Sequence, residues 1–171
     1  LTGEQSFLDE LKRRVDLLET DALERPIDDS WTQQELAEGI IEPGIRVLGP
    51  NSSGHTSTPH HFTSTFFPQG KIPRGNISYI AQTGNFATHT MRYIATGENF
   101  GVARVVGLGN KIDIDESEIL DYYGEDPETK AIFLYLESIK RPRQFLEVAR
   151  RVSRMKPVIM LKGGSTREGA L

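Results

Sequence analysis

Gly75-Asn-Ile-Ser-Tyr-Ile-Ala-Gln-Thr-Gly-Asn-Phe-Ala-Thr-His-Thr90 is the stretch that decides the fold. Its apolar run, 77–81, has the composition of a buried parallel strand. Thr83, Gly84 and Asn85 then supply a capping hydroxyl, a flexible backbone and a second polar cap, after which a helix-compatible segment begins. Free amide N–H groups at a helix start attract anions. We therefore predict a phosphate or carboxylate site at the carboxyl edge of a parallel sheet.

The same strand-then-helix rhythm continues to the end of the sequence. Further apolar strands are expected at 102–106, 131–136 and 156–161, with helices at 86–96, around 116–123 and from Pro142 onward. Connections of this length between parallel strands are right-handed crossovers, which place helices on both faces of the sheet. The predicted fold class is α/β with a doubly wound parallel sheet, and each strand ends in a glycine-rich or polar loop on one edge.

Glu137 follows the apolar strand 131–136 directly. Doubly wound folds bind ligands in the crevice outside the carboxyl ends of their strands, so Glu137 is the candidate catalytic carboxylate. Earlier in the chain, an acidic series at 113–118 follows the loop after the predicted strand 102–106. Asp115 or Ser117 could cap a helix there, and acidic residues suit its first turn. Contact of Asp113 or Asp115 with a cation or substrate is the alternative.

The composition excludes several classes of function. The chain has 171 residues, no cysteine, a net charge of -4 and a pI of about 5.6. Disulfides and zinc–thiolate sites are therefore excluded, and general affinity for nucleic acid is not expected. No run of about 18 apolar residues is present, and the acidic segment 1–10 does not resemble a signal peptide. We expect a cytoplasmic protein that contacts no membrane.

The first 70 residues are organised differently. We predict an amphipathic helix over 1–23, a second helix over 31–41 with Ser30 as N-cap, and a short strand over 45–48. Residues 52–70 have no period and are expected to form an extended connection at a domain boundary. His55, His60 and His61 in this connection could bind a metal, but no third ligand stands at a recognisable spacing, so an ordinary polar loop and no metal are predicted.

Six segments, taken together and in order, resemble the nucleoside-diphosphate-forming acyl-CoA synthetases, which include ADP-forming acetyl-CoA synthetase and the alpha chain of succinyl-CoA synthetase. The segments are Gly44-Ile-Arg-Val-Leu-Gly-Pro-Asn51, 75–84, Val106-Gly-Leu-Gly-Asn-Lys-Ile-Asp113, 126–139, Phe145-Leu-Glu-Val-Ala149 and 156–170. The resemblance runs from about residue 45 onward. No G-x-G-x-x-G, P-loop or G-x-S-x-G motif competes with it.

The resemblance implies a fold, a reaction and partners. It implies a flavodoxin-like ligase domain at 70–171, preceded at 1–69 by a helical segment and the C-terminal remnant of a CoA-binding Rossmann domain. An ATP-grasp domain or subunit, with Mg²⁺, would bind the nucleotide. A phosphoryl group would pass from ATP to a histidine and then to a small carboxylate, and CoA would displace phosphate to give the thioester. Such proteins are oligomers.

The resemblance also assigns site residues. The turn Thr83-Gly84-Asn85-Phe86 would hold the phosphohistidine, and Glu137 would orient its imidazole. Asn51 and Ser52 would lie near the CoA thiol, where the family commonly has cysteine in place of Ser52. Substrate contacts would come from Thr88, Gly109 and Asn110, and Thr88 stands where succinate-specific relatives have tyrosine.

The phosphorylated histidine itself is expected beyond Leu171, after the loop 163–170. None of His55, His60, His61 or His89 has its place, so the sequence predicts a chain truncated before the phosphohistidine loop and inactive alone. A non-catalytic domain of the same fold, binding CoA or docking a partner, is the alternative function.

Overall fold

The computed structural model describes residues 46–65, 71–97 and 100–164. These belong to a compact unit that begins at Arg46, so the helices predicted within 1–41 lie outside the described residues. The elements in chain order are β1 (His55–Ser57), β2 (Phe62–Thr63), β3 (Arg74–Ala81), α3 (Gly84–Gly97), β4 (Val102–Gly107), α4 (Glu116–Glu125), β5 (Ala131–Leu136), α5 (Pro142–Ser153) and β6 (Val158–Lys162).

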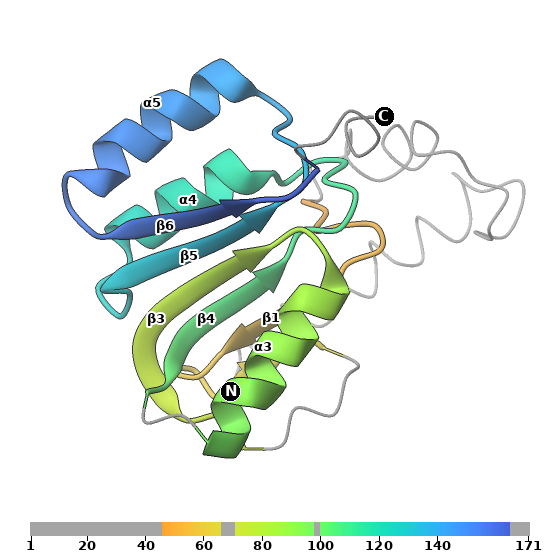
Figure 1. The fold of residues 1–171 in the computed structure, drawn as a ribbon, viewed down its shortest axis with the longest axis vertical. Helices are drawn as coiled ribbons and strands as arrows, with labels where there is room; N and C mark the ends of the chain where they lie inside the picture. The colour runs from red at the N-terminus through yellow and green to blue at the C-terminus, as the bar shows by residue number, and fades with distance from the viewer. Residues whose placement is uncertain (1–45, 66–70, 98–99, 165–171) are drawn as a thin grey trace, which may run out of the picture. The chain divides into compact units, whose positions relative to one another are not determined.

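The strands form one twisted sheet in the order β2-β1-β4-β3-β5-β6 (Figure 1). β4, β3, β5 and β6 are mutually parallel, as predicted, and β3 lies between the two strands that follow it in the chain. β1 is antiparallel to β4, and β2 is antiparallel to β1, so the whole sheet is mixed. The predicted α/β doubly wound arrangement is confirmed, with an antiparallel hairpin added at one side.

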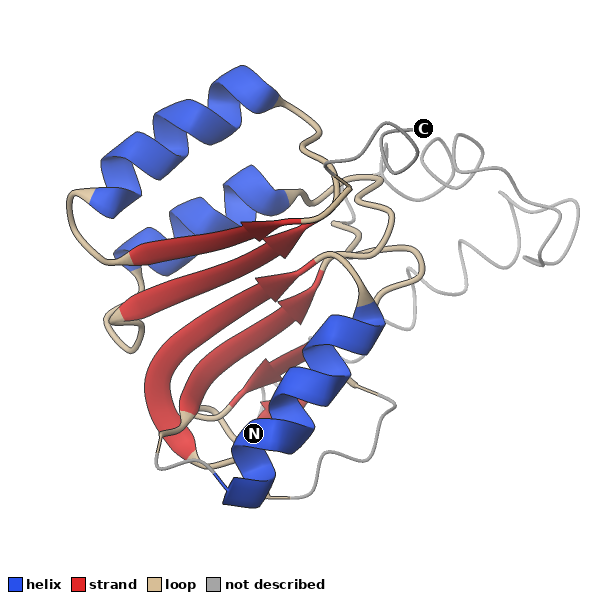
Figure 2. Cartoon of the chain, in the orientation of Figure 1, coloured by secondary structure: helices blue, strands red, loops and turns tan. Residues whose placement is uncertain are grey.

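Helices cover the two faces of the sheet separately (Figure 2). Side chains alternate between faces along each strand. Ile80, Ile132, Leu134 and Leu136 pack in a cluster with residues of α4 and α5. Tyr79 and Ala81 instead pack with Met91 and Ile94 of α3. Each face of the sheet thus has its own apolar layer, and the parallel strands between them have their carboxyl ends at one edge.

Helix starts follow the predicted capping chemistry. Asp115 is the N-cap of α4, and its Oδ1 accepts hydrogen bonds from the backbone N–H of Ser117 at 2.9 Å and of Glu118 at 3.2 Å. Pro142 begins α5, where a missing N–H costs no helical bond. Both features could be read from local sequence because a cap acts within one turn.

Two predictions about residues 45–70 are wrong in the described part. Arg46 to Leu48 form no strand, although the Val47 carbonyl accepts from the Ile114 N–H at 3.2 Å. The predicted extended connection contains the β1–β2 hairpin, which joins the sheet through β4. The strands are short and polar, so they carry no apolar period; the pairing of β1 with β4, and of β2 with β1, forms them.

Arg104 forms a buried ion pair and also bonds the hairpin. Arg104 on β4 donates from Nε to Asp126 Oδ2 at 2.7 Å, and both side chains are about 95% buried. Arg104 Nη1 also donates to Ser57 Oγ at 2.7 Å and lies 3.2 Å from His60 Nδ1. Burial raises the pKa of Asp126, but hydrogen bonds from Arg104 and Thr129 outweigh it and lower that pKa to about 2.

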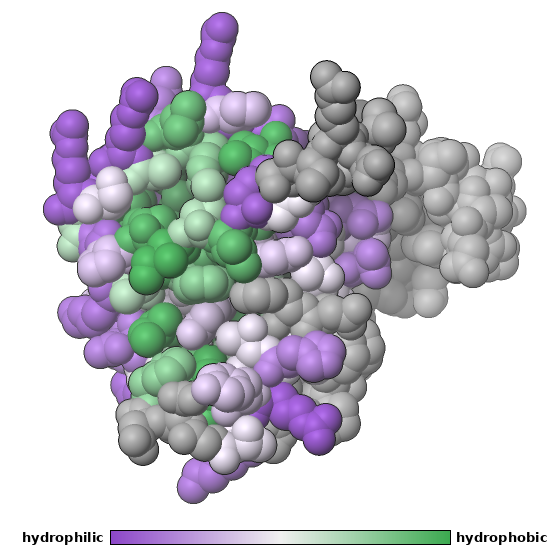
Figure 3. Space-filling view, in the orientation of Figure 1, coloured by the Kyte–Doolittle hydropathy of each residue, from purple (hydrophilic) through white to green (hydrophobic). Residues whose placement is uncertain are grey.

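β6 is one of the two edge strands of the described sheet, and its apolar side chains are open to solvent. Ile159, Met160 and Leu161 are 59%, 44% and 50% exposed. By register, Ile159 and Leu161 stand beside Phe133 and Tyr135 of β5, on the face that carries α3. Figure 3 shows apolar side chains gathered on this face.

Candidate active site

Four segments meet at the carboxyl edge because their strands are parallel. They are 82–84 after β3, 108–111 after β4, 137–140 after β5 and 163–164 after β6. Ligands of doubly wound sheets bind in the crevice at this edge. Glu137, Gly109, Asn110 and the predicted anion turn lie in these segments or in the first turn of α3. Thr88, the Asn51–Ser52 loop and the acidic candidates Asp113 and Asp115 lie outside them.

The predicted anion turn forms a genuine helix start. α3 begins at Gly84, directly after Thr83, and Asn85 and Phe86 follow in its first turn. The Thr83 carbonyl accepts from the Ala87 N–H at 3.3 Å, so the earlier N–H groups of this turn are the ones a ligand could use. The Thr88 hydroxyl donates to the Gly84 carbonyl at 2.8 Å and is thereby engaged within the helix.

Glu137 has a backbone held by hydrogen bonds and a carboxylate that has no partner among the described residues. Its N–H donates to Gln82 Oε1 at 2.9 Å, and its carbonyl accepts from Lys162 Nζ at 2.6 Å. Its side chain is exposed and makes no hydrogen bond or ion pair with any residue in the described ranges. Gly163 lies next to it: a Cβ there would stand 3.6 Å from Glu137 Cγ, an ordinary contact, and 3.0 Å from Tyr135 Oη. Within the described ranges, no side chain therefore competes with a ligand for the Glu137 carboxylate.

The loop with Asn51 and the loop with Gly109 and Asn110 lie side by side. The Asn110 N–H donates to the Pro50 carbonyl at 2.9 Å. Gly109 has φ of +60°, and a Cβ there would clash with the Pro50 carbonyl oxygen and lie 2.6 Å from that of Asn51. The structure therefore brings the predicted CoA loop and the predicted substrate loop together.

Ser52 does not present its hydroxyl to solvent. Its Oγ donates to the Gly107 carbonyl at 2.5 Å and accepts from the Gly54 N–H at 2.9 Å. The hydroxyl thus fixes the loop against the end of β4. Asn51, which is exposed and has φ of +56°, is the polar side chain of this loop that reaches outward.

The two acidic candidates have structural partners. Asp113 accepts from Arg46 Nε at 2.9 Å and from the Val47 N–H at 2.8 Å. The hydrogen bond from Arg46 is the main cause that lowers the pKa of Asp113. Asp115, besides capping α4, accepts from Arg141 Nε at 2.8 Å. The sequence left open whether these carboxylates cap a helix or contact a cation or substrate. Asp115 caps α4, and Asp113 forms an ion pair with Arg46.

Two polar residues at this edge, the half-buried Gln82 and the buried Lys111, were missed by sequence reasoning. Gln82 Oε1 accepts from the N–H groups of Glu137 and Ser138, both at 2.9 Å, and from Lys111 Nζ at 3.2 Å. Lys111, whose side chain is 4% exposed, forms an ion pair with the fully buried Glu116 at 3.0 Å. Gln82 follows a buried strand directly, as Glu137 does, and that position was the available signal.

The histidines lie apart from Glu137. His55 pairs with Val106 on β4, and β1 is three strand positions from β5, or about 14 Å at the usual strand spacing. Its pKa is lowered, chiefly by burial. His89 is exposed on α3. In the part of the chain described, no group of three His, Asp or Glu side chains could hold a metal, and no helix is long and apolar enough to cross a membrane.

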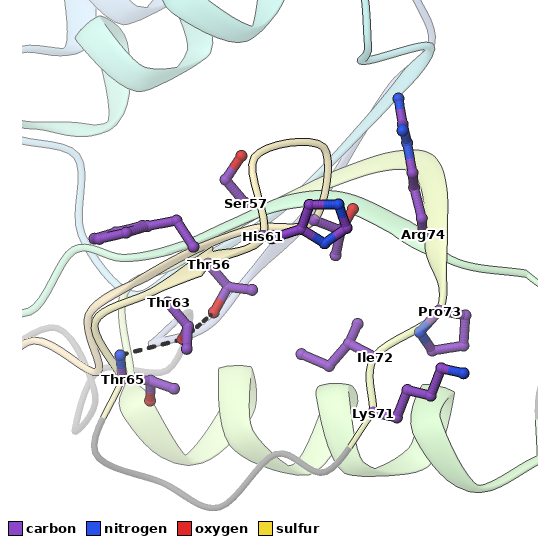
Figure 4. A pocket seen from close by; sticks show the side chains of 11 residues that line it. Thr56, Ser57, His61, Thr63, Thr65, Lys71, Ile72, Pro73 and Arg74 are labelled. Carbon is purple, nitrogen blue, oxygen red and sulfur yellow. Dashed lines mark hydrogen bonds between the residues drawn. The ribbon is translucent and has the colours of Figure 1, made fainter.

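A cavity of about 490 Å³ lies at the other end of the sheet (Figure 4). Its walls come from the β1–β2 hairpin and the segment leading into β3, including His61, Lys71 and Arg74. None of the predicted site residues lines it. The cavity is therefore separate from the carboxyl edge where Glu137 and the α3 start meet.

Comparison with known proteins settles the family. The family model described as "Succinyl-CoA ligase like flavodoxin domain" matches residues 74–171, more than half of the chain. The chain belongs to this family. The resemblance inferred from the six sequence segments is thereby confirmed, as is the flavodoxin-like fold class.

Members of the family with curated names include long ADP-forming ligases. The chain is 38% identical over 138 residues to acetate–CoA ligase [ADP-forming] I subunit alpha of Pyrococcus furiosus, covering 81% of this chain and 29% of that protein. It is 41% identical over 138 residues to acetate–CoA ligase [ADP-forming] II of Archaeoglobus fulgidus, covering 80% and 20%. The chain thus spans less than a third of the length of these relatives.

Solved structures agree in fold. The apo dinucleotide-forming acetyl-coenzyme A synthetase 1 of Ca. Korarchaeum cryptofilum superposes with a TM-score of 0.75 at 40% identity, covering 81% of this chain and 30% of that one. The same synthetase is known in complex with phosphate and ADP, again with a TM-score of 0.75 and 40% identity.

Proposed function

We propose that this chain is the ligase domain of an NDP-forming acyl-CoA synthetase, acting within a larger assembly. The assembly makes acyl-CoA reversibly from a carboxylate, CoA and ATP through a phosphohistidine. Family membership and the ADP-forming names of the relatives support this reaction class. The observation that carries the proposal is that the Glu137 carboxylate, which has no partner among the described residues, and the N-terminus of α3 lie at the same edge of the sheet.

The proposed reaction proceeds in three steps. A histidine nitrogen attacks the terminal phosphorus of the nucleotide, and the diphosphate leaves. A substrate carboxylate oxygen then takes the phosphoryl group and frees the imidazole. The CoA thiolate finally attacks the acyl phosphate carbon, and inorganic phosphate leaves with its electron pair. The histidine would come from a segment outside the described residues.

Each candidate has a role that fits its position. The N–H groups at Gly84, Asn85 and Phe86, with the helix dipole, would stabilise the phosphoryl oxygens. The Glu137 carboxylate would accept the second imidazole N–H, which orients the ring and leaves the other nitrogen to bond phosphorus. Thr83 would lie directly before these N–H groups, at the start of the phosphate-binding turn.

The thiol and the acyl group would meet at the paired loops. Asn51 and Ser52 would border the CoA thiol, and Gly109, Asn110 and Thr88 would border the acyl substrate. The hydrogen bond between Asn110 and Pro50 keeps these two loops adjacent, which the final thioester-forming step requires.

The remaining components would come from elsewhere in the assembly. An ATP-grasp domain or subunit, with its Mg²⁺, would bind the nucleotide. The short span of this chain relative to its relatives supports such additional parts. We further propose an oligomeric, cytoplasmic enzyme.

The test uses the complete protein that carries this sequence, with its nucleotide-binding partner and radiolabelled ATP. We expect acid-labile, base-stable label on histidine, and Glu137→Gln should reduce its rate of formation by more than about tenfold, the effect of roughly 1.4 kcal/mol. Glu147→Gln on the outer face of α5 is the matched control and should leave the rate unchanged.

The result also separates the ligase from a docking domain of the same fold. A variant with Glu137→Ala and Asn85→Ala should still bind the partner but form no label. Undiminished labelling in that variant would refute the proposed role of this edge and favour the docking function.

A further inference from the structure

Gln82 joins the two halves of the candidate phosphate site through one side chain. Its backbone precedes Thr83 and the start of α3, and its N–H donates to the Tyr135 carbonyl at 2.9 Å. Its Oε1 accepts from both backbone N–H groups that follow β5, at Glu137 and Ser138. The position of the Glu137 backbone relative to the helix start is therefore set largely by this amide.

The orientation of the Gln82 amide is itself fixed. Its Nε2 donates to Ser138 Oγ at 3.0 Å, while Oε1 accepts from three donors. If the amide were flipped, its NH2 group would face those three donors and could bond none of them. The third donor is Lys111 Nζ, which also lies 2.9 Å from the Ser138 carbonyl. Lys111, in the loop after β4, thus holds the Gln82 amide through this hydrogen bond.

The Lys111 charge is compensated within the same network. Lys111 and Glu116 form an ion pair at 3.0 Å between side chains that are 4% and 0% exposed. Glu116 Oε1 also accepts from the Lys140 N–H at 2.7 Å, and Lys140 Nζ donates to the Lys111 carbonyl at 2.6 Å. A buried pair of this kind contributes little net stability compared with apolar packing, so its use here favours a role in geometry.

The hydrogen-bond network of Gln82 reaches the backbone of Glu137 but not its carboxylate. The carboxylate of Glu137 has no partner in the described ranges, although its backbone is held on one side by Gln82 and on the other by Lys162. A carboxylate on a fixed backbone has only its own side-chain torsions to settle when a ligand arrives. This is the arrangement expected of a group that must meet a reacting ring in one geometry.

We propose that Gln82, held by the Lys111–Glu116 pair, is a positioning residue that sets the Glu137 carboxylate against the N-terminus of α3. The inference rests on the function proposed above for Glu137. Gln82 touches no reacting atom and acts through Glu137. A displacement of about 1 Å at a reacting group can cost about 10²-fold in rate, so loss of this one acceptor is expected to matter.

The experiment compares two replacements of Gln82 in the complete protein with its partner. Gln82→Met keeps the length of the side chain and removes the acceptor. Gln82→Glu keeps an oxygen for the Glu137 and Ser138 N–H groups. The same Gln→Met change at Gln144, on α5, is the matched control.

The first measurement is amide hydrogen exchange at Glu137 and Ser138. We expect Gln82→Met to accelerate it by about tenfold or more, because the backbone N–H groups of Glu137 and Ser138 lose the one side-chain oxygen that accepts from both. Gln82→Glu and Gln144→Met should leave it close to the parent value. Unchanged exchange in Gln82→Met would overturn the inference whatever the turnover.

The second measurement is turnover, alone and combined with Glu137→Gln. Gln82→Met should lower kcat by about 10- to 100-fold with KM for CoA changed less than about threefold, since binding groups are untouched. In the Glu137→Gln background it should cost little more, because it acts through Glu137. Full kcat in Gln82→Met, or losses that multiply fully in the double variant, would overturn the inference.

Failure of the proposed function gives a different pattern. Full turnover of Glu137→Gln alone would refute the catalytic proposal for Glu137, and the positioning role of Gln82 with it. Faster exchange in Gln82→Met would then show only that the amide holds the loop after β5.

Discussion

Replacing Asp126 by asparagine tests whether the buried pair with Arg104 stabilises the fold. The substitution keeps the size and shape of the side chain and removes its charge. Asp126 Oδ1 accepts from Arg104 Nη2 at 3.0 Å and Oδ2 from Nε at 2.7 Å, an arrangement with two parallel bonds. Thr129 Oγ1 donates to Oδ2 at 2.6 Å. The variant leaves a buried guanidinium without its counter-charge.

The magnitude follows from the pKa of Asp126, which lies at about 2 in the folded chain against an ordinary value of 3.8. The gap of about 1.8 corresponds to about 2.4 kcal/mol of stability at neutral pH. Because the folded pKa is the lower one, this stability is complete well above pH 4 and is lost as pH falls toward 2. At pH 3 about half of it should remain.

The assay is urea unfolding followed by circular dichroism at pH 7, 5, 4 and 3. Asp126→Asn should lower the free energy of unfolding by about 2 to 3 kcal/mol at pH 7, and its difference from the parent should shrink as the pH falls. Glu125→Gln, next in sequence and 68% exposed, is the control, and its pair with Arg151 should contribute less than about 1 kcal/mol.

Two results would refute this reasoning. A loss below about 1 kcal/mol at pH 7 would mean that desolvation of the pair cancels its attraction. A loss that stays constant from pH 7 to pH 3 would mean that the charge of Asp126 is not the stabilising feature.

Three further predictions concern other parts of the unit. Gly109→Ala should destabilise the chain by about 1 to 3 kcal/mol in urea unfolding, since its φ of +60° and the Pro50 carbonyl both oppose a Cβ; a neutral effect would show that the loops do not pack as described. Arg46→Met should raise the pKa of Asp113 toward its ordinary value in a carboxyl NMR titration, because the Arg46 hydrogen bond is the main cause that lowers it; an unmoved titration would contradict that cause. Tyr123→Phe should cost less than about 1 kcal/mol, because the buried hydroxyl reaches its one carbonyl only at 3.5 Å, whereas Tyr123→Ala should cost about 3 to 5 kcal/mol; comparable losses in the two would mean that the hydroxyl matters.

The parallel strands and the helix starts could be predicted because their signals are local. The run 131–136 is apolar at every position, and Asp115 caps a helix within its own turn. Glu137 could be placed at the carboxyl edge for the same reason, since it follows such a run directly. Its backbone position is as expected; its role stays a prediction.

The polar network could not be predicted because it depends on register. Gln82 and Ser138 are 56 residues apart and meet only because Ala81 pairs with Tyr135. Once β3 and β5 are taken as neighbours with ends aligned, a glutamine after one strand and a glutamate after the other become adjacent. Arg104 and Asp126 likewise meet through the crossover of α4, which no local pattern encodes.

The hairpin was missed for a different reason. β1 and β2 have three and two residues, all but Phe62 polar. The burial of β1 follows from its pairing with β4 rather than from its composition, and β2, which pairs with β1, is exposed. The predicted division of the chain near residue 70 remains a prediction, although β1 shares its sheet with the strands beyond that point.

The edge strand β6 affects how the stability of this chain is measured. Within the described sheet only β5 pairs with it, and Ile159, Met160 and Leu161 are about half exposed. A free strand edge with apolar side chains pairs readily with another chain. Any such association binds the folded state and not the unfolded one, so mass action makes the apparent midpoint of unfolding rise with protein concentration. Melting temperatures of this 171-residue chain are therefore comparable only at one stated concentration.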